Sequence, residues 1–247
     1  MDLRGARILV PGATGEIGAA LAVRLHALGA RTALAGRDRE ALTRVSAACE
    51  HAPARTFDAW DADSCAKTVD WAAAELGGLD GVVVCVGVAA FGPVEELATD
   101  QWQQQIDLNI TGLMNAIGAF TPQLVEAAAE RGVADLINTS SIAAQNIFPD
   151  FAVYSATKAY VSHLSRHLRV ELGPKNVRVA AVEPGIVGTE LQDHVTDRGA
   201  LDWLESSKET IEWLTPQDVA ETIGFIAMLP PRANLQQITI MPTAQAS

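Results

Sequence analysis

The chain alternates short runs of β-branched and small apolar residues with longer stretches in which apolar residues recur at a helical period. The short runs show no polar alternation, which is typical of strands covered on both faces of a parallel sheet. Strands are predicted at 6–11, 31–36, 54–59, 80–87, 134–141, 177–184 and 236–241, and helices at 16–29, 38–50, 63–77, 101–130, 152–173 and 216–229.

This strict alternation of strands and helices predicts one fold class. Strand–helix–strand units place their strands parallel and join them by right-handed crossovers. We therefore expect an α/β protein with a doubly wound Rossmann-type sheet of about seven parallel strands and helices on both faces. The 247 residues contain no linker or repeat, which favours a single domain over 1–247. Ligands of such sheets bind beyond the carboxyl ends of the strands.

A glycine-rich loop follows the first predicted strand. In PGATGEIGAAL, Gly12, Gly15 and Gly18 are spaced three apart between a strand and a helix. Glycines there let the backbone turn tightly and approach a pyrophosphate, to which the helix N-terminus offers N–H groups. The loop therefore predicts a dinucleotide site. Glu16 is expected to face solvent, because a carboxylate turned inward would repel phosphate.

The end of the second strand bears on the choice of coenzyme. It carries no acid at Ala35-Gly36, and Arg37 follows at once. A guanidinium at this place can pair with a 2′-phosphate, which favours NADP(H). Asp38 stands where an acid would hold the ribose of NAD(H), yet its position before a helix is typical of an N-cap. NAD(H) is the alternative, with Arg37 merely solvated.

Tyr154 and Lys158 are four residues apart on a predicted helix, and Ser141 ends the preceding strand. Residues at i and i+4 share a helix face, so the phenol and the ammonium point to the same place. A nearby cation lowers a tyrosine pKa, which gives an acid/base for an alcohol or a carbonyl. Ser141 can hold the same oxygen. The alternative is a packed tyrosine beside a solvated lysine.

The substrate side of the site is harder to read. The stretch 190–214 is expected to form a lid over the site, with Trp203 and Trp213 either shaping a pocket or covering a helix pair. Apolar walls rich in Ala, Ile and Phe indicate a modestly apolar carbonyl substrate. The predicted pocket residues are Ala89, Ala143, Phe148, His194 and Trp203.

Composition excludes several other classes of function. The net charge of -12 argues against nucleic acids and anionic membranes as partners. The three cysteines and five histidines have no metal-type spacing, so no metal site is predicted. The N-terminus lacks the pattern of a signal peptide and no apolar run is long enough to span a membrane, which indicates a cytoplasmic protein.

These motifs together resemble the classical short-chain dehydrogenase/reductase family from about residue 5 to the C-terminus. The middle glycine at 15 is placed as in the extended branch, which includes epimerases and dehydratases. The tail resembles weakly the branch of 3-hydroxy acid and clavaldehyde dehydrogenases. One departure is the VVVCVG segment, where Val84 and Cys85 replace two asparagines that hold a strand in the family.

The resemblance implies roles for individual residues. Asp58 matches the acid that contacts adenine, and Asn109 matches the asparagine that anchors a proton-relay water. The residues implied for catalysis are Asn109, Ser141, Tyr154 and Lys158. Those predicted to bind the coenzyme are Gly12, Thr14, Gly15, Ile17, Gly18, Arg37, Asp58, Ala59, Gly87, Asn109, Tyr154, Lys158, Pro184, Gly185, Val187 and Thr189.

The expected activity is NADP(H)-dependent interconversion of an aldehyde or ketone with an alcohol, as in carbonyl reductases and alcohol dehydrogenases. A non-catalytic NADP(H)-binding regulator is an alternative, prompted by the lost asparagines. An epimerase or dehydratase is disfavoured, because the chain lacks the extra C-terminal substrate domain of those enzymes. The family's subunit contacts imply a homotetramer, with a dimer as second choice.

Overall fold

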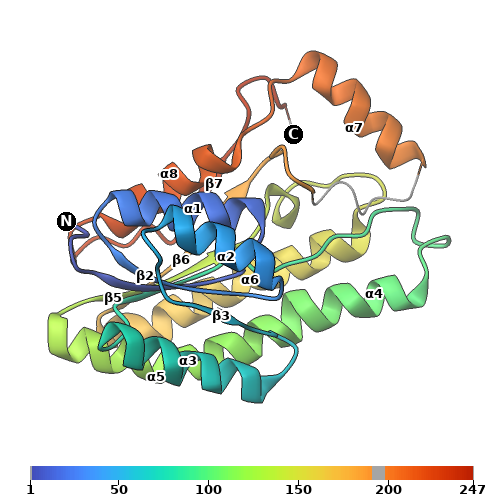
Figure 1. Ribbon diagram of the computed structural model, residues 1–247. Helices are drawn as coiled ribbons and strands as arrows, with labels where there is room; N and C mark the ends of the chain where they lie inside the picture. Colours follow the sequence, from blue (N-terminus) through green and yellow to red (C-terminus); the bar gives the residue numbers. More distant parts are fainter. Residues whose placement is uncertain (1, 191–197, 247) are drawn as a thin grey trace.

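The structure, a computed structural model, describes residues 2–190 and 198–246. At its centre is a sheet of seven strands in the order β3-β2-β1-β4-β5-β6-β7, with every neighbouring pair parallel (Figure 1). The doubly wound fold class is therefore confirmed. The strands are β1 (Arg7–Pro11), β2 (Arg31–Gly36), β3 (Ala54–Thr56), β4 (Gly81–Val84), β5 (Ala134–Thr139), β6 (Val177–Pro184) and β7 (Gln237–Ile240).

Helices cover both faces of the sheet (Figure 1). One face carries α1 (Glu16–Ala27), α2 (Arg39–Ala48) and α8 (Pro216–Ala227), and the other carries α3 (Ala62–Leu76), α5 (Leu113–Arg131) and α6 (Ala152–Leu172). Each layer encloses its own apolar core, because β1, β4 and β6 are buried along their whole length and send side chains to both sides.

The predicted helix over 101–130 is interrupted. It divides into α4 (Thr99–Ile106), a π-helical turn η1 (Asp107–Gly112) and α5. Asn109 lies in that turn and binds both backbone groups of Val88. The strand β4 ends at Val84 and not at residue 87 as predicted, and further on Val88 pairs with this side chain and not with a neighbouring strand. π-turns of this kind are frequent at functional sites.

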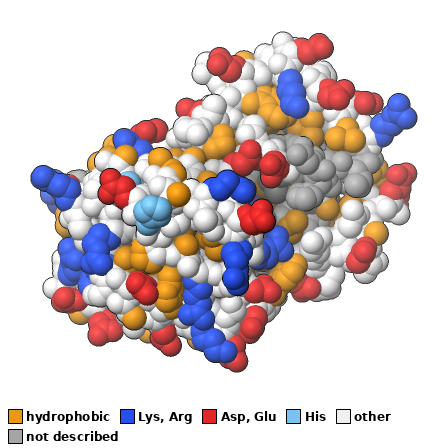
Figure 2. Space-filling view, in the orientation of Figure 1, with side chains coloured by type: hydrophobic (Ala, Val, Ile, Leu, Met, Phe, Trp, Pro, Cys, Tyr) orange, Lys and Arg blue, Asp and Glu red, His pale blue; other side chains and the backbone are white. Residues whose placement is uncertain are grey.

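The sequence pattern missed the helix α7 (Arg198–Thr210) within the predicted lid. The segment is rich in charged and polar residues, and of its described side chains only Leu204 and Ser207 are buried. In Figure 1 the helix stands away from the sheet, and Figure 2 shows it as a separate lobe with apolar side chains on its surface.

Two further findings concern the described residues alone. None of their helices combines the length and the apolar character needed to cross a membrane. Within the same residues, no group of three or more His, Cys, Asp or Glu side chains is arranged to hold a metal ion.

Candidate active site

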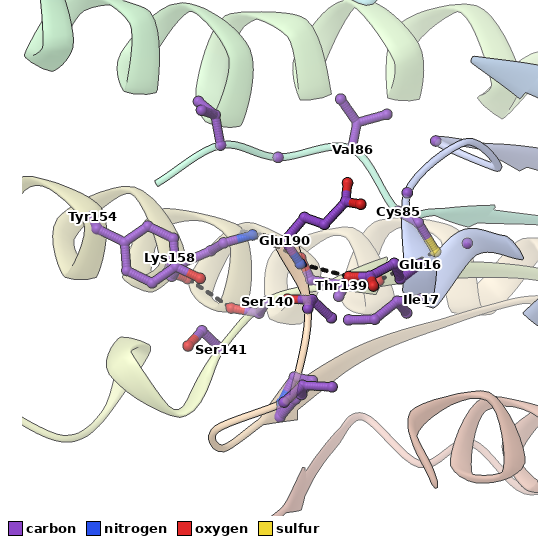
Figure 3. A pocket seen from close by; sticks show the side chains of 18 of the residues that line it. Glu16, Ile17, Cys85, Val86, Thr139, Ser140, Ser141, Tyr154, Lys158 and Glu190 are labelled. Carbon is purple, nitrogen blue, oxygen red and sulfur yellow. Dashed lines mark hydrogen bonds between the residues drawn. The ribbon is translucent and has the colours of Figure 1, made fainter. Parts of the chain in front are cut away.

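A cleft of about 430 Å³ runs along the carboxyl ends of the strands, where the fold class places ligands. Figure 3 shows Tyr154, Lys158 and the two serines 140 and 141 at one end, and Glu16 with Ile17 towards the other. Most of the predicted site residues line this cleft, namely Gly12, Thr14, Gly15, Ile17, Gly18, Arg37, Ala59, Gly87, Ser141, Ala143, Phe148, Tyr154, Lys158, Pro184, Gly185, Val187 and Thr189.

The three glycines of the first loop have different structural roles. A Cβ on Gly12 would lie 2.4 Å from the Cys85 carbonyl oxygen, and one on Gly18 would lie 2.1 Å from the Gly12 carbonyl oxygen. Gly12 also has φ +87°, which favours glycine. A Cβ on Gly15 would have the Gly12 oxygen at 3.7 Å as its only neighbour, so this side of the loop is open.

The open side of the loop suits an anion. Gly15 is the N-cap of α1 and supplies no side-chain hydrogen bond, which leaves N–H groups of the first turn without a side-chain acceptor. These groups and the helix dipole together form the type of site that binds a phosphate. The residues present therefore fit the pyrophosphate of a dinucleotide.

Glu16 is exposed, as expected, but it lines the cleft and does not turn away from it. Its Oε2 accepts a hydrogen bond of 2.6 Å from the backbone N–H of Glu190 (Figure 3). The contact joins the glycine loop to the segment after β6. Because its oxygen is engaged in this bond, the carboxylate is directed to the opposite wall of the cleft.

Arg37 and Trp60 form a pair near the ends of β2 and β3. The Arg37 guanidinium carbon lies 5.6 Å from the centre of the Trp60 ring, within the range of a cation–π contact. Asp38 is the N-cap of α2, since it accepts from the N–H groups of Glu40 at 2.8 Å and Ala41 at 3.0 Å. That prediction is confirmed, and Asp38 is thus engaged by the helix.

Asp58, predicted to contact adenine, is not among the residues that line the cleft. It accepts a 3.0 Å bond from the Trp60 N–H and its own N–H binds Ser64 Oγ at 3.1 Å. Its neighbour Ala59 does line the cleft. In this structure Asp58 shapes the loop that carries Ala59 and Trp60.

Tyr154 lies at the centre of the site, with its side chain buried and a hydrogen bond to Ser141. Burial raises the Tyr154 pKa to about 12, and the Ser141 bond opposes that rise only in part. The Lys158 Nζ is 5.8 Å from the ring centre and donates to the Thr139 carbonyl at 3.1 Å. Burial is the larger cause, so the net shift of the Tyr154 pKa is upward and not the lowering that the Lys158 spacing predicted.

The Lys158 ammonium is itself strongly perturbed. Burial lowers the Lys158 pKa to about 8, since a charged amine loses water on entering the site. Gly87 makes room for it, because a Cβ there would lie 3.3 Å from Nζ and 3.4 Å from Asn109 Oδ1. The absence of a side chain at Gly87 thus permits the close approach of both polar groups.

Asn109 is 2 % exposed and lies just behind the cleft. Its side chain accepts from the Val88 N–H at 2.9 Å and donates to the Val88 carbonyl at 2.8 Å and to Thr157 Oγ1 at 3.0 Å. These bonds hold the segment after β4. They hold this segment although the two asparagines of the family are absent. Cys85 adds a further contact, since its Sγ accepts from Thr139 Oγ1 at 3.6 Å.

Beyond β6, the strand-end motif is held by a residue that no local sequence pattern predicts. Gln245 Oε1 accepts a 3.0 Å bond from the Ile186 N–H and Gln245 lines the cleft. A Cβ on Gly185 would lie 2.4 Å from that same oxygen. Only the fold brings the C-terminal tail back across the end of β6, so no local pattern marks this glutamine.

The substrate side is an apolar cluster of Ala89, Phe91, Ala143, Tyr154 and Leu204, with Phe148, Phe151 and Trp213 packed against it. Ala89 belongs to the cluster but lies behind the cleft, while Phe151 and Leu204 line it and were not predicted. Two predicted pocket residues are not placed: His194 lies outside the described residues, and Trp203 is in α7 without a described side chain.

A parallel sheet of this order, a glycine loop at its first strand and a Ser–Tyr–Lys group at its fifth define an oxidoreductase that uses a nicotinamide dinucleotide. The sequence profile described as short chain dehydrogenase matches residues 6–199. The chain belongs to the short-chain dehydrogenase family.

Individual relatives agree with this assignment. An uncharacterised oxidoreductase of Listeria innocua is 30% identical over 251 residues, which cover 99% of each chain. A glycine betaine reductase of Emericella nidulans is 33% identical over 97% of this chain but only 19% of its own length. The solved structure of a serine dehydrogenase complexed with NADP+ has a TM-score of 0.88 and 28% identity, covering 97% of this chain and 96% of the other.

Proposed function

We propose that the protein is an NADP(H)-dependent reductase that interconverts an aldehyde or ketone with an alcohol. The observation that carries the proposal is the placement of Tyr154, which lines the cleft together with Ser141 and Lys158 and has the Lys158 Nζ 5.8 Å from its ring centre. Burial raises the Tyr154 pKa, so the phenol is protonated in the physiological range and has a proton to donate.

Ser141, Tyr154 and Lys158 have different roles in the reduction of the substrate carbonyl. Negative charge develops on a carbonyl oxygen as it is reduced, and the Ser141 hydroxyl stabilises it by a hydrogen bond already aimed at that place. Tyr154 donates its proton to the same oxygen. Lys158 then stabilises the phenolate that remains, and Asn109 holds the segment after β4 against α6. The coenzyme, when bound, supplies the hydride.

NADP(H) is proposed as the coenzyme, with NAD(H) as the alternative. Support comes from Arg37, which lines the cleft next to Gly36 and is stacked with Trp60, while Asp38 is engaged in capping α2. A 2′-phosphate would therefore meet a guanidinium and not a free carboxylate. The serine dehydrogenase of similar fold was solved with NADP+.

The remaining parts of the proposal concern the segment 190–214, the assembly and the location. We propose that this segment, with α7, is a lid, because Leu204 of α7 lines the cleft and belongs to the same apolar cluster as Tyr154 and Phe91. A homotetramer in the cytoplasm is proposed from the family alone, with a dimer as second choice. The regulator and epimerase or dehydratase alternatives have no observation that favours them over the reductase.

The test is oxidation of NADPH and NADH in the presence of aldehydes, ketones and 3-oxo acids. We expect turnover that Tyr154→Phe reduces by about 10²–10⁴-fold while coenzyme binding persists. The matched control is Tyr160→Phe, since the chain has 2 tyrosines and Tyr160 is partly exposed on α6. Turnover that survives in Tyr154→Phe would contradict the mechanism. Tight coenzyme binding without any turnover would favour the regulator.

A further inference from the structure

The phenol of Tyr154 emerges from a group of aromatic rings that the sequence did not bring together. Phe91 comes from the segment after β4, while Phe148 and Phe151 precede α6. The rings of Phe91 and Phe151 are stacked with centroids 3.9 Å apart, and Phe91 meets the Tyr154 ring edge-on at 5.4 Å. Phe148 and Phe151 are 5.4 Å apart. We call Phe91, Phe148 and Phe151 the aromatic wall.

All three rings of the aromatic wall line the cleft, and Leu204 of α7 lines it too and belongs to the same apolar cluster. The wall is thus adjacent to the oxygen that gives up its proton. A substituent on the carbonyl carbon can therefore pack against these rings when the substrate oxygen reaches Tyr154 and Ser141. Aromatic rings bind other aromatic rings through stacked and edge-on contacts, beyond the effect of area alone.

The charges on the described lining point in the same direction. Its only basic residues are Arg37 and Lys158. Arg37 follows β2, three strand positions from β5 in the sheet order, which corresponds to about 14 Å. Lys158 donates to the Thr139 carbonyl. A substrate carboxylate would need a cation close by. Of the two basic residues in the described lining, Arg37 is remote from the wall and Lys158 is engaged with the Thr139 carbonyl.

The group of side chains around Trp213 leads to the same conclusion. Lys208 lies over the Trp213 ring with Nζ 4.9 Å from its centre, and Trp213 Nε1 donates to Ser207 Oγ at 3.2 Å. The cation is therefore held on an indole face, and Lys208 is not among the described residues that line the cleft. The indole joins the apolar cluster behind Leu204.

We infer that the substrates are neutral aryl aldehydes or aryl ketones, whose ring packs on the aromatic wall; this inference rests on the proposed reductase function. In the reaction, the carbonyl compound, NADPH and one proton give the alcohol and NADP+. The carbonyl carbon gains the hydride, its oxygen gains the Tyr154 proton, and solvent returns a proton to Tyr154. The inference separates this chain from reductases whose substrates carry a carboxylate.

The experiment measures kcat/KM with NADPH for benzaldehyde, cyclohexanecarbaldehyde, 4-carboxybenzaldehyde and succinic semialdehyde. Benzaldehyde and cyclohexanecarbaldehyde have the same carbon skeleton. The ratio of their kcat/KM values therefore reflects only the aromatic ring and the difference in intrinsic reactivity. The same ratio is then measured in Phe148→Leu and Phe151→Leu. Comparison with the unaltered protein cancels the difference in intrinsic reactivity between the two aldehydes. Each variant is expected to lower the ratio by about two- to tenfold.

The matched control is Phe225→Leu, because Phe225 is 52% exposed on α8 and is not part of the lining. Its ratio is expected to equal that of the unaltered protein. Both carboxylated aldehydes are expected to be poor substrates. The inference is overturned if neither wall variant changes the ratio, or if a carboxylated aldehyde is preferred.

Failure of the inference and failure of the proposed function give different results. Turnover of succinic semialdehyde that depends on Tyr154 would leave the reductase standing and overturn the aryl substrate. No turnover of any compound would overturn the proposed function. In that event, benzyl alcohol added to the NADP+-loaded protein tests the wall alone: a rise in Tm that Phe151→Leu abolishes supports the inference, and no rise overturns it.

Discussion

The Lys158 ammonium donates to the Thr139 carbonyl oxygen at 3.1 Å, although Tyr154 lies one helical turn away with its ring centre 5.8 Å from Nζ. The bond ties α6 to the end of β5. Lys158 is thereby fixed next to the phenol without being bonded to it. When Tyr154 loses its proton, Lys158 therefore acts on the phenolate through its charge and not through a hydrogen bond.

Reduction is expected to depend on a single ionisation near pH 8. Burial lowers the Lys158 pKa to about 8, while Tyr154, with a pKa of about 12, keeps its proton across the accessible range. As pH rises through 8, Lys158 loses the charge that stabilises the phenolate. We expect kcat/KM for reduction to be level below pH 8 and to fall up to tenfold per pH unit above it.

A profile measured with NADPH from pH 6 to 10 checks this expectation. Lys158→Arg provides the comparison, because arginine stays charged throughout. If that variant retains measurable activity, its profile should be level. A break near pH 8 that persists in Lys158→Arg would assign the ionisation to another group.

Replacing Lys158 by Met is expected to stabilise the protein while removing its activity. The Lys158 pKa falls from 10.5 to about 8 on folding, so between these values the unfolded chain binds more protons and stability rises with pH. Below pH 8 the full penalty of the buried charge is present, which amounts to about 3 kcal/mol at 1.36 kcal/mol per pKa unit. Lys158→Met removes it.

Urea unfolding at pH 7 and pH 10 tests the point, with Lys175→Met as the control at an exposed lysine. The gain in the free energy of unfolding should be largest at pH 7 and should shrink towards pH 10, because there the wild-type lysine is mostly neutral. Equal stability of Lys158→Met and the unaltered protein at pH 7 would show that the charge is compensated.

Much of this site follows from local patterns in the sequence. The glycine loop, the Tyr154–Lys158 pair and the N-cap at Asp38 each depend on residues close together in the chain, so spacing alone located them. The apolar runs without polar alternation likewise predicted the parallel sheet. Boundaries were wrong where a distant group intervened, as at β4, whose extension is bonded to Asn109.

Other features depend on contacts between distant segments. The aromatic wall joins Phe91 to Phe151, sixty positions later, and no periodicity relates them. Gln245 reaches Ile186 only because β7 pairs with β6. The direction of the Tyr154 pKa shift also depended on burial. The i, i+4 spacing predicts a neighbouring cation but not how much water the fold removes from the phenol.

Arg37→Ala is expected to weaken NADPH binding and to leave NADH binding nearly unchanged. The guanidinium stands at the end of β2, stacked with Trp60, where a 2′-phosphate would be placed. Loss of a charge-assisted hydrogen bond corresponds to about 10- to 100-fold in Kd. The control is Arg39→Ala, which removes an exposed arginine two residues away. Titration of coenzyme fluorescence measures both constants, and a parallel loss for NADH would contradict the coenzyme proposal.

Glu183 is a buried carboxylate beneath the site, and we expect it to hold the site together. It is 0 % exposed and accepts from Ser162 Oγ at 2.6 Å, Gln237 Nε2 at 2.9 Å, Thr239 Oγ1 at 3.3 Å and the Gln145 side chain. These donors come from α6, from β7 and from the segment that follows Ser141. Four donors satisfy an oxygen pair that burial would otherwise make costly.

In Glu183→Gln, an amide replaces one acceptor oxygen and brings N–H groups against N–H and O–H donors. The free energy of unfolding should fall by about 1–3 kcal/mol. Because Ser162 is 2.8 Å from Ser140 Oγ, which donates to the Lys158 carbonyl, kcat should fall more than coenzyme affinity. Glu171→Gln, at an exposed position of α6, is the control. An unchanged kcat in a destabilised Glu183→Gln would confine Glu183 to stability, and unchanged stability would contradict the bonding described here.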